Sequence, residues 1–404
     1  MKSFALLLVL SAPLAAAAVI GDDEIRRILT ERIDARKQAV GIVAGVIDPA
    51  GRRVIAHGKL AAGDTRTPDG DTVFEIGSVT KVFTALLLAD MVARGEVALD
   101  DPVSKYLPQE VRMPRRGGRD ITLQDLATHT SGLPRLPSPF TPKNPANPYA
   151  DYSVEDLYRF LSSHELRRDI GSQYEYSNLG GGLLGHVLAR RAGMDYESLV
   201  RARITGPLGM NDTRIALTPQ MQSRLASGHN ERLAPVANWD LPTLAGAGAL
   251  RSTVNDLLKF VAVPLGDSNR PLAKAMSAML AVRRPTGAPT LEIALGWHVA
   301  KRGGREIIWH NGGTGGYGEG DQVLPEGRGR SDRLRGGRSE RPCDRPGSAP
   351  GRTAHQRQAD RVITIRPPAR PSGDPIRRGR FRSPADPRWR RADRRRLVAA
   401  ADRA

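Results

Sequence analysis

The chain is organised around FEIGSVTK, residues 74–81. An apolar, helix-forming run continues over residues 82–94, and Gly95 is suited to end it, so Ser78 is predicted to lie in the first turn of a buried helix. Because they are three positions apart, the Ser78 hydroxyl and the Lys81 amine share one face of that helix. A serine hydroxyl becomes a nucleophile once a base takes its proton, and a neutral lysine can be that base.

Taken alone, Ser-x-x-Lys is a weak signal, since a capping serine followed by a solvated lysine has the same spacing. A second stretch, YEYSN at residues 174–178, places a phenol and an amide two positions apart, where both can point into one cleft. Tyr176 could there relay a proton from Ser78 to a leaving group, and Asn178 could bind a substrate amide and orient Lys81. By itself, this stretch also fits a polar loop with a half-buried tyrosine.

A third stretch, WHNGGTGGY at residues 309–317, follows a predicted strand. Its glycines allow a substrate backbone to lie alongside as an added strand. The backbone N–H of Gly313 could join that of Ser78 in an oxyanion hole. A phosphate-binding glycine loop would need a helix and a Lys-Ser or Lys-Thr pair next, and neither follows.

The composition sets the outer limits of the interpretation. The chain has 404 residues, which suits one large domain or two closely packed ones. Its single cysteine, Cys343, excludes an intrachain disulfide and argues against a cysteine-based metal site. The net charge of +18 is concentrated at the end, where residues 329–404 contain 22 arginines, no lysine and 8 acidic residues. Because the rest is nearly balanced, we expect no nucleic-acid partner.

The first 18 residues have the pattern of a secretory signal peptide: Lys2, an apolar run over residues 4–10, and Ala-x-Ala sites within residues 15–18. No later run is long and apolar enough to suggest a transmembrane anchor. We therefore expect the mature chain to begin near Val19 and to work in the periplasm or as a secreted protein.

Hydrophobic periodicity predicts strands at both ends of the chain and helices between them. The strands are expected at 41–48, 52–58, 293–301 and 306–310, and the main helices at 21–38, 82–94, 154–162, 180–193, 194–204 and 254–261. This order predicts an α+β fold, with an α/β part from residues 19–100 and 286–328 and a helical part from residues 101–285.

Two loops near the predicted site also need an interpretation. THTSGLP, residues 128–134, contains His129 and Ser131, and we interpret it as a tight turn that braces the site rather than as a catalytic segment. Residues 137–148 are rich in proline and asparagine, which predicts a long surface loop and a candidate lid.

Together, Ser78-x-x-Lys81, Tyr176-x-Asn178 and His310-x-Gly312 resemble, in order and separation, the serine β-lactamase and penicillin-binding protein superfamily. The resemblance is closest to the class C β-lactamase-like branch, which includes D-Ala-D-Ala carboxypeptidases and some esterases. It covers about residues 22–317, and further stretches at 128–134, 207–210 and 247–253 agree with it.

The resemblance implies a β-lactamase/transpeptidase-like fold, in which an antiparallel sheet is flanked by helices and carries a helical insertion. It implies a serine hydrolase that forms an acyl-enzyme, with a small-molecule substrate (a β-lactam, an ester or a peptidoglycan stem peptide), no metal and no cofactor. A monomer is expected. The implied roles are Ser78 as nucleophile, Lys81 and Tyr176 as the base system, and Asn178, His310, Gly312 and Gly313 as substrate-binding residues.

The chain departs from class C β-lactamases in one motif, because His310-Asn311-Gly312 stands where they carry Lys-Thr-Gly. Lysine is charged at pH 7, whereas a histidine with an ordinary pKa near 6.5 is mostly neutral. His310 is therefore expected to bind a substrate carboxylate more weakly than a lysine would, or in a pH-dependent way. His-x-Gly occurs among the peptidases and esterases of the family.

The chain departs again after residue 328, where the family continues with two more strands and a C-terminal helix. Residues 329–404 have almost no apolar period, and such a sequence cannot bury enough apolar surface to offset the entropy lost on ordering. We expect this tail to be disordered or out of frame, so that the C-terminal part of the sheet is missing. One possible set of codons for residues 334–337 encodes Cys-Val-Val-Val when the reading frame is shifted by one base. Such a sequence suits the strand that the family has next. The alternative is a non-catalytic product, either damaged or binding envelope polymers through its basic tail.

Overall fold

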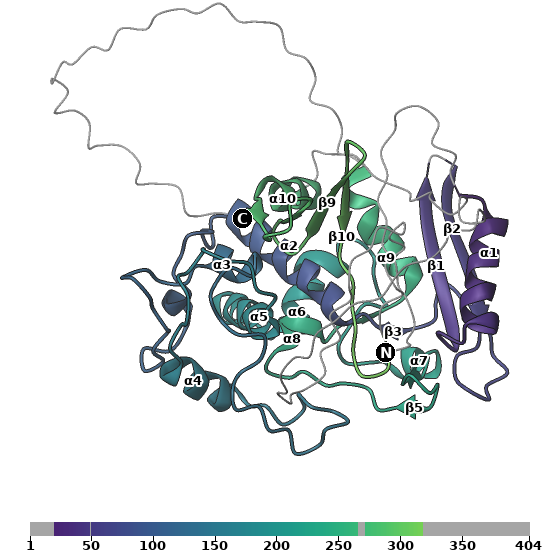
Figure 1. Ribbon diagram of the computed structural model, residues 1–404, viewed down its shortest axis with the longest axis horizontal. Helices are drawn as coiled ribbons and strands as arrows, with labels where there is room; N and C mark the ends of the chain where they lie inside the picture. The colour runs from purple at the N-terminus through teal and green to yellow at the C-terminus, as the bar shows by residue number, and fades with distance from the viewer. Residues whose placement is uncertain (1–19, 49, 266–270, 318–404) are drawn as a thin grey trace, which may run out of the picture. The chain divides into compact units, whose positions relative to one another are not determined.

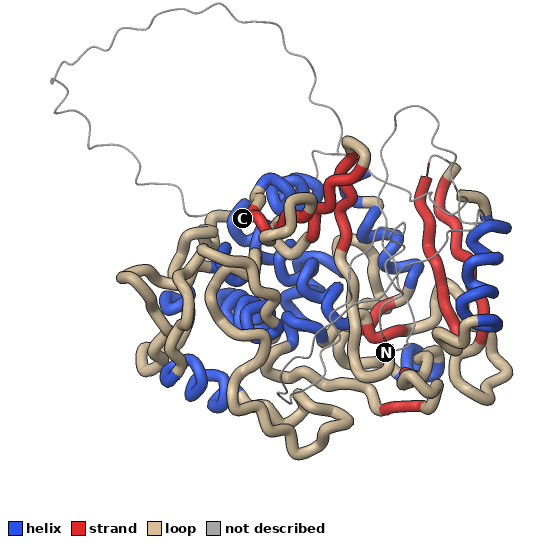
Figure 2. The backbone as a smooth tube through the Cα atoms, in the orientation of Figure 1, coloured by secondary structure: helices blue, strands red, loops and turns tan. Residues whose placement is uncertain are grey.

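The computed structural model describes residues 20–48, 50–265 and 271–317, whose backbone is traced in Figures 1 and 2. The expected signal peptide and the arginine-rich tail lie outside the described residues. In the described part of the chain, no helix combines the length and the apolar character needed to cross a membrane.

The N-terminal layer is a β-hairpin between two helices (Figure 1). Strand β1 (Gly41–Asp48) pairs antiparallel with β2 (Gly51–Gly58) along its whole length, as predicted. Helix α1 (Asp22–Thr30) continues as a π-helical turn (Glu31–Ala35) and packs on β2, whereas α9 (Val254–Val261) packs on β1.

Side chains alternate between the two faces of this hairpin, as the period of a strand requires. Ile42 belongs to the small apolar cluster that also contains residues of α1, while its neighbour Val43 belongs to the main core. The approach of α9 is close, because a methyl group added to Gly45 would lie 2.6 Å from the Val254 side chain. A small residue at this position therefore lets the helix and the strand meet.

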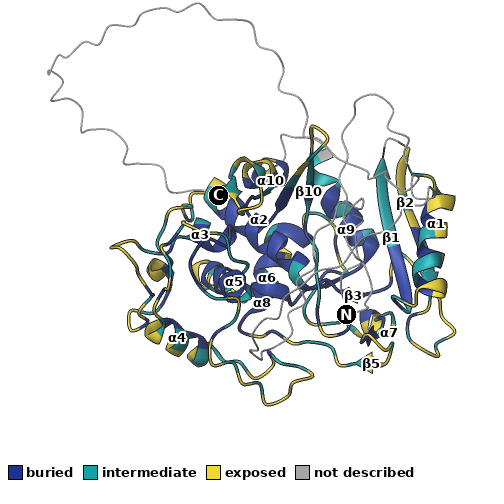
Figure 3. Cartoon of the chain, in the orientation of Figure 1, coloured by how far each residue is buried: buried dark blue, intermediate teal, exposed yellow. Residues whose placement is uncertain are grey.

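Helix α2 (Thr80–Ala93) forms the centre of the main core. Every residue from Thr80 to Met91 is buried, so the helix is covered on all sides, as Figure 3 shows by its dark blue colour. Its backbone ends where predicted, with Gly95 in the left-handed region at φ +70°. A helix that is apolar all round belongs inside a protein, and its few polar residues are candidates for function.

The second sheet is antiparallel and has the strand order β10-β9-β8-β7. Its strands are β7 (Arg284–Pro285), β8 (Leu291–Ile293), β9 (His298–Arg302) and β10 (Arg305–Trp309). The prediction of one strand over 293–301 was wrong, because the chain turns at Gly296 (φ +69°) and separates β8 from β9. Helix α10 (Pro271–Ala281), which was not predicted, packs on α2.

The intervening segment is mainly helical. It contains α3 (Leu123–Ala127), α4 (Val154–Ser163), α5 (Asn178–Ala192), α6 (Tyr196–Val200), α7 (Pro219–Ser223) and α8 (Ala245–Gly248), with short strands β4 (Gly228–His229) and β5 (Pro235–Val236). The predicted helix over 194–204 is shorter, because a π-helical turn (Arg201–Thr205) follows α6. Helix α5 packs on α8, where Gly185 and Gly246 are in contact.

A two-residue strand pair holds the start of the central helix in place. Strand β3 (Phe74–Glu75) pairs with β6 (Arg251–Ser252), and Arg251 donates a buried charged hydrogen bond of 3.1 Å to Glu75. Both side chains are almost fully buried. Since β3 precedes Ser78 by only three residues, this pairing fixes where the serine enters the core.

The α+β layout is confirmed. The resemblance implied an antiparallel sheet flanked by helices, and the described strands form a two-stranded and a four-stranded antiparallel sheet together with two short strand pairs. The expectation that the C-terminal part of the sheet is missing concerns residues outside the described part of the chain.

Candidate active site

Ser78 lies in a 3-10 helical turn (Gly77–Val79) that leads directly into α2, in the first turn of the buried helix as predicted. Its side chain is partly accessible, whereas its neighbours on both sides are buried. The Lys81 Nζ lies 3.0 Å from the Ser78 Oγ, so the predicted contact between hydroxyl and amine is present.

Lys81 is a buried lysine, 3% exposed, and its amine reaches three oxygen atoms. These are Ser78 Oγ at 3.0 Å, Asn178 Oδ1 at 2.9 Å and the Ala247 carbonyl oxygen at 2.6 Å. No carboxylate of the described residues forms an ion pair with it. Burial, with a further contribution from the positive charge of Arg135, holds the pKa of Lys81 well below its usual value.

The neutral amine fits these three partners. It has two N–H donors and one lone pair, and the two carbonyl-type oxygens of Asn178 and Ala247 can only accept hydrogen bonds. When they take both N–H groups, the lone pair is left for the Ser78 hydroxyl proton. The geometry therefore suits Lys81 as the base that activates Ser78.

The second motif is positioned by a helix cap. The Ser177 hydroxyl accepts a 2.8 Å hydrogen bond from the Gly180 N–H at the start of α5 and donates one of 2.7 Å to the Pro134 carbonyl oxygen. The Ser177 side chain is therefore held by the start of α5 and by the carbonyl oxygen of Pro134. Its neighbours reach the site: the Tyr176 ring centre lies 4.9 Å from Lys81 Nζ, and Asn178 contacts Lys81 directly.

The third motif runs beside the nucleophile turn. A methyl group added to Gly77 would lie 2.7 Å from the Gly313 nitrogen, and one added to Gly312 would collide with the Ile76 carbonyl oxygen and lie 3.3 Å from the Ser78 nitrogen. Only glycines permit this approach. The Gly313 backbone therefore lies against the turn that carries the Ser78 N–H, which is the placement that an oxyanion hole requires.

His310 is placed at the site but is not suited to carry a charge. It is 3% exposed, and its Nδ1 lies 2.6 Å from the Asn311 carbonyl oxygen, which makes Nδ1 the protonated nitrogen. Its Nε2 is buried without a hydrogen-bond partner among the described residues. Burial first, then the neighbouring His298 and Lys81, hold the pKa of His310 well below its usual range.

The loop of residues 128–134 braces the site, in agreement with the sequence interpretation. The buried His129, in the left-handed region at φ +56°, accepts a 3.1 Å hydrogen bond at Nδ1 from the Ser177 N–H. Its ring centre lies 4.5 Å from that of Tyr176. The Ser131 Oγ accepts the Leu133 N–H at 3.2 Å and so holds the turn itself.

Sequence reasoning missed four residues that complete the site. Tyr149 accepts a 3.3 Å hydrogen bond from Asn178 Nδ2, and Ala247 accepts from Lys81. The ring centres of His298 and His310 lie 5.3 Å apart. The central guanidinium carbon of Arg135 lies 5.2 Å from the ring centre of Tyr176. Arg135 directly follows the quoted loop, and Tyr149 directly follows the candidate lid, so proximity to these loops was the available signal.

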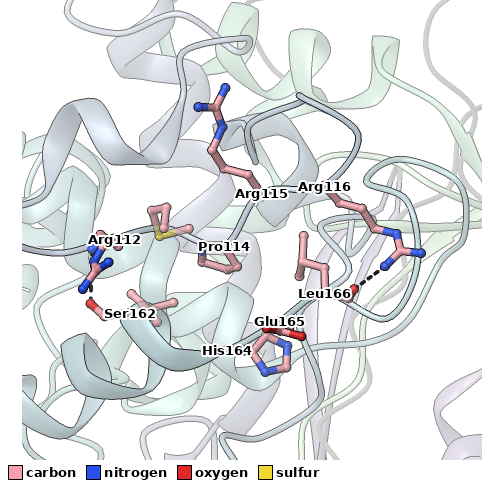
Figure 4. A pocket seen from close by; sticks show the side chains of 10 residues that line it. Arg112, Pro114, Arg115, Arg116, Ser162, His164, Glu165 and Leu166 are labelled. Atoms are coloured by element: carbon pink, nitrogen blue, oxygen red, sulfur yellow. Dashed lines mark hydrogen bonds between the residues drawn. The ribbon is translucent and has the colours of Figure 1, made fainter.

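A separate hollow of about 400 Å³ lies between the residue 112–116 loop and the C-terminal end of α4 (Figure 4). Arg112, Arg115 and Arg116 line it together with His164 and Glu165. Two of these arginines are already engaged in ion pairs, Arg115 with Asp120 and Arg116 with Asp169. The hollow shares no residue with the Ser78 site.

A serine in the first turn of a buried helix, next to a buried lysine amine and beside a glycine-rich strand end, is the arrangement expected of a serine hydrolase. The family model described as Beta-lactamase matches residues 25–326. The chain therefore belongs to the beta-lactamase family of serine hydrolases.

Two curated relatives and two solved structures illustrate the likeness. The chain is 34% identical over 296 residues to the D-alanyl-D-alanine-carboxypeptidase/endopeptidase AmpH of Escherichia coli K12, covering 69% of this chain and 74% of AmpH. It is 31% identical over 258 residues to a beta-lactamase of the same organism, covering 64% of each chain.

The first structure is the beta-lactamase/D-alanine carboxypeptidase of Yersinia pestis complexed with citrate. It superposes with a TM-score of 0.61 at 27% identity, covering 73% of this chain and 86% of that one. A Pseudomonas syringae protein with the same description has a TM-score of 0.62 at 21% identity, covering 74% and 88%, and shows the fold alone. The predicted β-lactamase/transpeptidase-like fold is thus confirmed.

Proposed function

We propose that this protein hydrolyses acyl donors through an acyl-enzyme on Ser78, and that peptides ending in D-Ala-D-Ala are its main substrates. The observation that carries the proposal is the 3.0 Å contact between Lys81 Nζ and Ser78 Oγ in a buried site whose lysine has no carboxylate partner among the described residues. β-Lactams and esters are the other substrate classes that this chemistry accepts.

In the first half of the reaction, the Ser78 Oγ attacks the substrate carbonyl carbon while its proton passes to the Lys81 amine. The N–H groups of Ser78 and Gly313 stabilise the negative charge on the carbonyl oxygen. The C–N or C–O bond to the leaving group then breaks, and the leaving group takes up a proton delivered through Lys81 and Tyr176. The product is an ester between the acyl group and Ser78.

In the second half, a water molecule gives its proton to the same base system and attacks the ester carbonyl. The bond to Ser78 Oγ breaks, the serine regains its proton, and the carboxylic acid is released. Asn178 holds the lysine amine through its Oδ1. Its Nδ2, which donates to Tyr149, is the group we assign to the substrate amide once substrate is bound.

Two observations favour a peptidase over a β-lactamase. The chain is 34% identical to a D-alanyl-D-alanine-carboxypeptidase/endopeptidase. In addition, His310 stands where class C β-lactamases carry a lysine, and His-x-Gly occurs among the peptidases and esterases of the family. We further propose that the protein works outside the cytoplasm, because residues 1–18 have a signal-peptide pattern. N-terminal sequencing of the exported chain, expected to begin near Val19, tests this.

The proposed activity is tested by turnover of three substrates: a peptide ending in D-Ala-D-Ala, a penicillin and a neutral aryl ester. We expect steady release of D-alanine and of the phenol, and slow release of hydrolysed penicillin after rapid acylation. The Ser78→Ala variant is expected to lose all three reactions. Absence of turnover for every substrate in the unmodified protein would refute the proposal, as would activity that survives in Ser78→Ala.

A further inference from the structure

The site contains one cation that the sequence motifs did not predict. With Lys81 and His310 both buried and held toward their neutral forms, neither supplies a fixed positive charge for an anionic substrate. His310 Nδ1 is also committed to the Asn311 carbonyl oxygen at 2.6 Å. A substrate carboxylate therefore needs another partner, and Arg135 is an always-charged group at the site.

Arg135 is tied to the second motif through its backbone. Its carbonyl oxygen accepts hydrogen bonds from the N–H groups of Asn178 at 3.0 Å and Leu179 at 3.1 Å, at the first turn of α5. Its guanidinium carbon lies 5.2 Å from the centre of the Tyr176 ring. The backbone bonds fix where the side chain begins, and the aromatic ring directs where its charge lies.

The guanidinium is exposed, and no acidic side chain of the described residues forms an ion pair with it. Its charge nevertheless acts on the site. It is among the causes that lower the pKa of Lys81 and of His129, in both cases after burial. The positive potential of Arg135 therefore reaches the reacting groups, while the guanidinium itself remains open to a ligand.

We propose that Arg135 is the anion-binding residue of this site, and that it selects acyl donors whose leaving group carries a carboxylate. The guanidinium fork can accept a carboxylate through two parallel hydrogen bonds, a geometry that a buried neutral imidazole cannot offer. Because Arg135 lies against Tyr176, which we place next to the leaving group, the carboxylate belongs on the leaving-group side. This inference rests on the proposed function and specifies its substrate class.

The other role open to Arg135 is purely structural: the guanidinium packs on Tyr176 and keeps the ring in place. The two roles differ in their consequences. A packing role affects all substrates equally, because every reaction uses Tyr176, whereas an anion-binding role affects only substrates that carry the charge.

The test uses two aryl esters with the same acyl group, one releasing meta-hydroxybenzoate and the other releasing meta-hydroxybenzamide. The leaving groups are similar in size and position, and only the first carries a negative charge. At a pH on the plateau of the pH profile of both proteins, we expect Arg135→Gln to lower kcat/KM for the carboxylate ester about tenfold or more, chiefly through KM, and to change the carboxamide ester less than about twofold. Arg135→Lys is expected to restore part of the difference.

Two controls complete the experiment. Arg112→Gln removes another exposed arginine, which lines the separate hollow of Figure 4, and is expected to leave both esters unaffected. Added salt is expected to reduce the preference for the carboxylate ester in the unmodified protein and not in Arg135→Gln.

The outcomes separate this inference from the proposed function. The anion-binding role is overturned if Arg135→Gln leaves the ratio of kcat/KM for the two esters unchanged, whether both values fall equally or neither falls. Either result leaves the assignment as a serine hydrolase intact. Failure of the unmodified protein to hydrolyse either ester and to release D-alanine from the peptide refutes the proposed function itself.

Discussion

The chemistry of a single residue, Lys81, depends on how its hydrogen-bond partners are distributed. Two of its three neighbouring oxygens can only accept, and no acidic group of the described residues stabilises a charged amine. Burial is the main cause that lowers its pKa, and Arg135 adds to it. Enzymes commonly obtain a lysine base in this way, by removing the amine from water and placing positive charge nearby.

The pH dependence of acylation tests this description. Because the pKa of Lys81 is lowered, its neutral fraction rises with pH and is complete well below the ordinary pKa near 10.5. The rate for a neutral ester is therefore expected to rise with pH and level off far below pH 10. Arg135→Gln removes one cause of the low pKa, so its rising limb is expected to move to higher pH. The measurement is kcat/KM against pH for both proteins.

Two results would contradict this prediction. One is a rising limb centred near pH 10 in the unmodified protein, which would mean that Lys81 titrates as an exposed lysine. The other is a full rate in Lys81→Ala, where a loss of about 10²-fold or more is expected.

Among single residues, those that stand at a fixed spacing within a motif could be identified from the sequence. Ser78 and Lys81 are three positions apart, and Tyr176 and Asn178 are two apart, so local geometry predicts their relative placement. Arg135 had no such pattern. It reaches the site because its loop is hydrogen-bonded to the start of α5, a tertiary contact that spacing does not encode.

Among the elements, the most demanding contact is the one between the nucleophile turn and the segment after β10. Gly77 and Gly312 allow the two backbones to approach so closely that a methyl group on either would strike the other. The contact places the Gly313 backbone against the turn that carries Ser78. We therefore expect catalytic rate and packing to depend on the same two glycines.

Substitution of Gly312 by alanine is expected to damage both properties. The added methyl group collides with the Ile76 carbonyl oxygen, which displaces the strand end and with it the Gly313 N–H. We expect the free energy of unfolding to fall by about 1–3 kcal/mol and the acylation rate to fall about 10²-fold or more. Chemical denaturation and the rate of labelling by a penicillin measure the two effects.

Gly303→Ala is the matched control in the neighbouring hairpin turn between β9 and β10. Gly303 has φ +52° and open space around it, so alanine costs about 1–2 kcal/mol of backbone strain without a collision. It is expected to lose stability and to keep the acylation rate. Equal rate losses in the two variants would show that the effect of Gly312→Ala comes from instability alone.

Elements that form because of residues adjacent in the sequence were predictable, and those that depend on contacts with distant parts of the chain were not. The hairpin of β1 and β2 follows from alternating side chains and an adjacent turn, and its boundaries agree within one residue. The β3–β6 pair joins Glu75 to Arg251, far along the chain, through two residues each, too short for any periodic signal. The turn at Gly296 was missed because the surrounding residues remain apolar and buried.

For the whole molecule, the expectation that residues 329–404 are disordered or out of frame concerns a part of the chain outside the described residues. The family match ends at residue 326, just before the arginine-rich sequence begins. Among the described residues, β10 pairs only with β9, so its other edge has no described partner. An unpaired strand edge favours aggregation. We therefore continue to propose that the tail results from a shifted reading frame.

Restoring the frame is expected to stabilise the protein. A valine-rich segment in place of the tail would cover the edge of β10, and burying about 400 Å² of apolar surface contributes on the order of 10 kcal/mol. The midpoint of thermal unfolding and the yield of penicillin labelling are both expected to rise. A chain ending at residue 328 is the control, because it loses the arginines without gaining strands. If the chain with its present tail unfolds cooperatively and labels as well as the restored one, the frame hypothesis is wrong.

The central claim is that Ser78 is a nucleophile activated by Lys81, and one measurement tests it most directly. The protein is incubated with a penicillin, digested, and the modified peptide is identified by mass spectrometry. The account predicts a single acyl adduct on Ser78, absent from Ser78→Ala and formed far more slowly in Lys81→Ala. An adduct on another residue, or one that persists in Ser78→Ala, would contradict it.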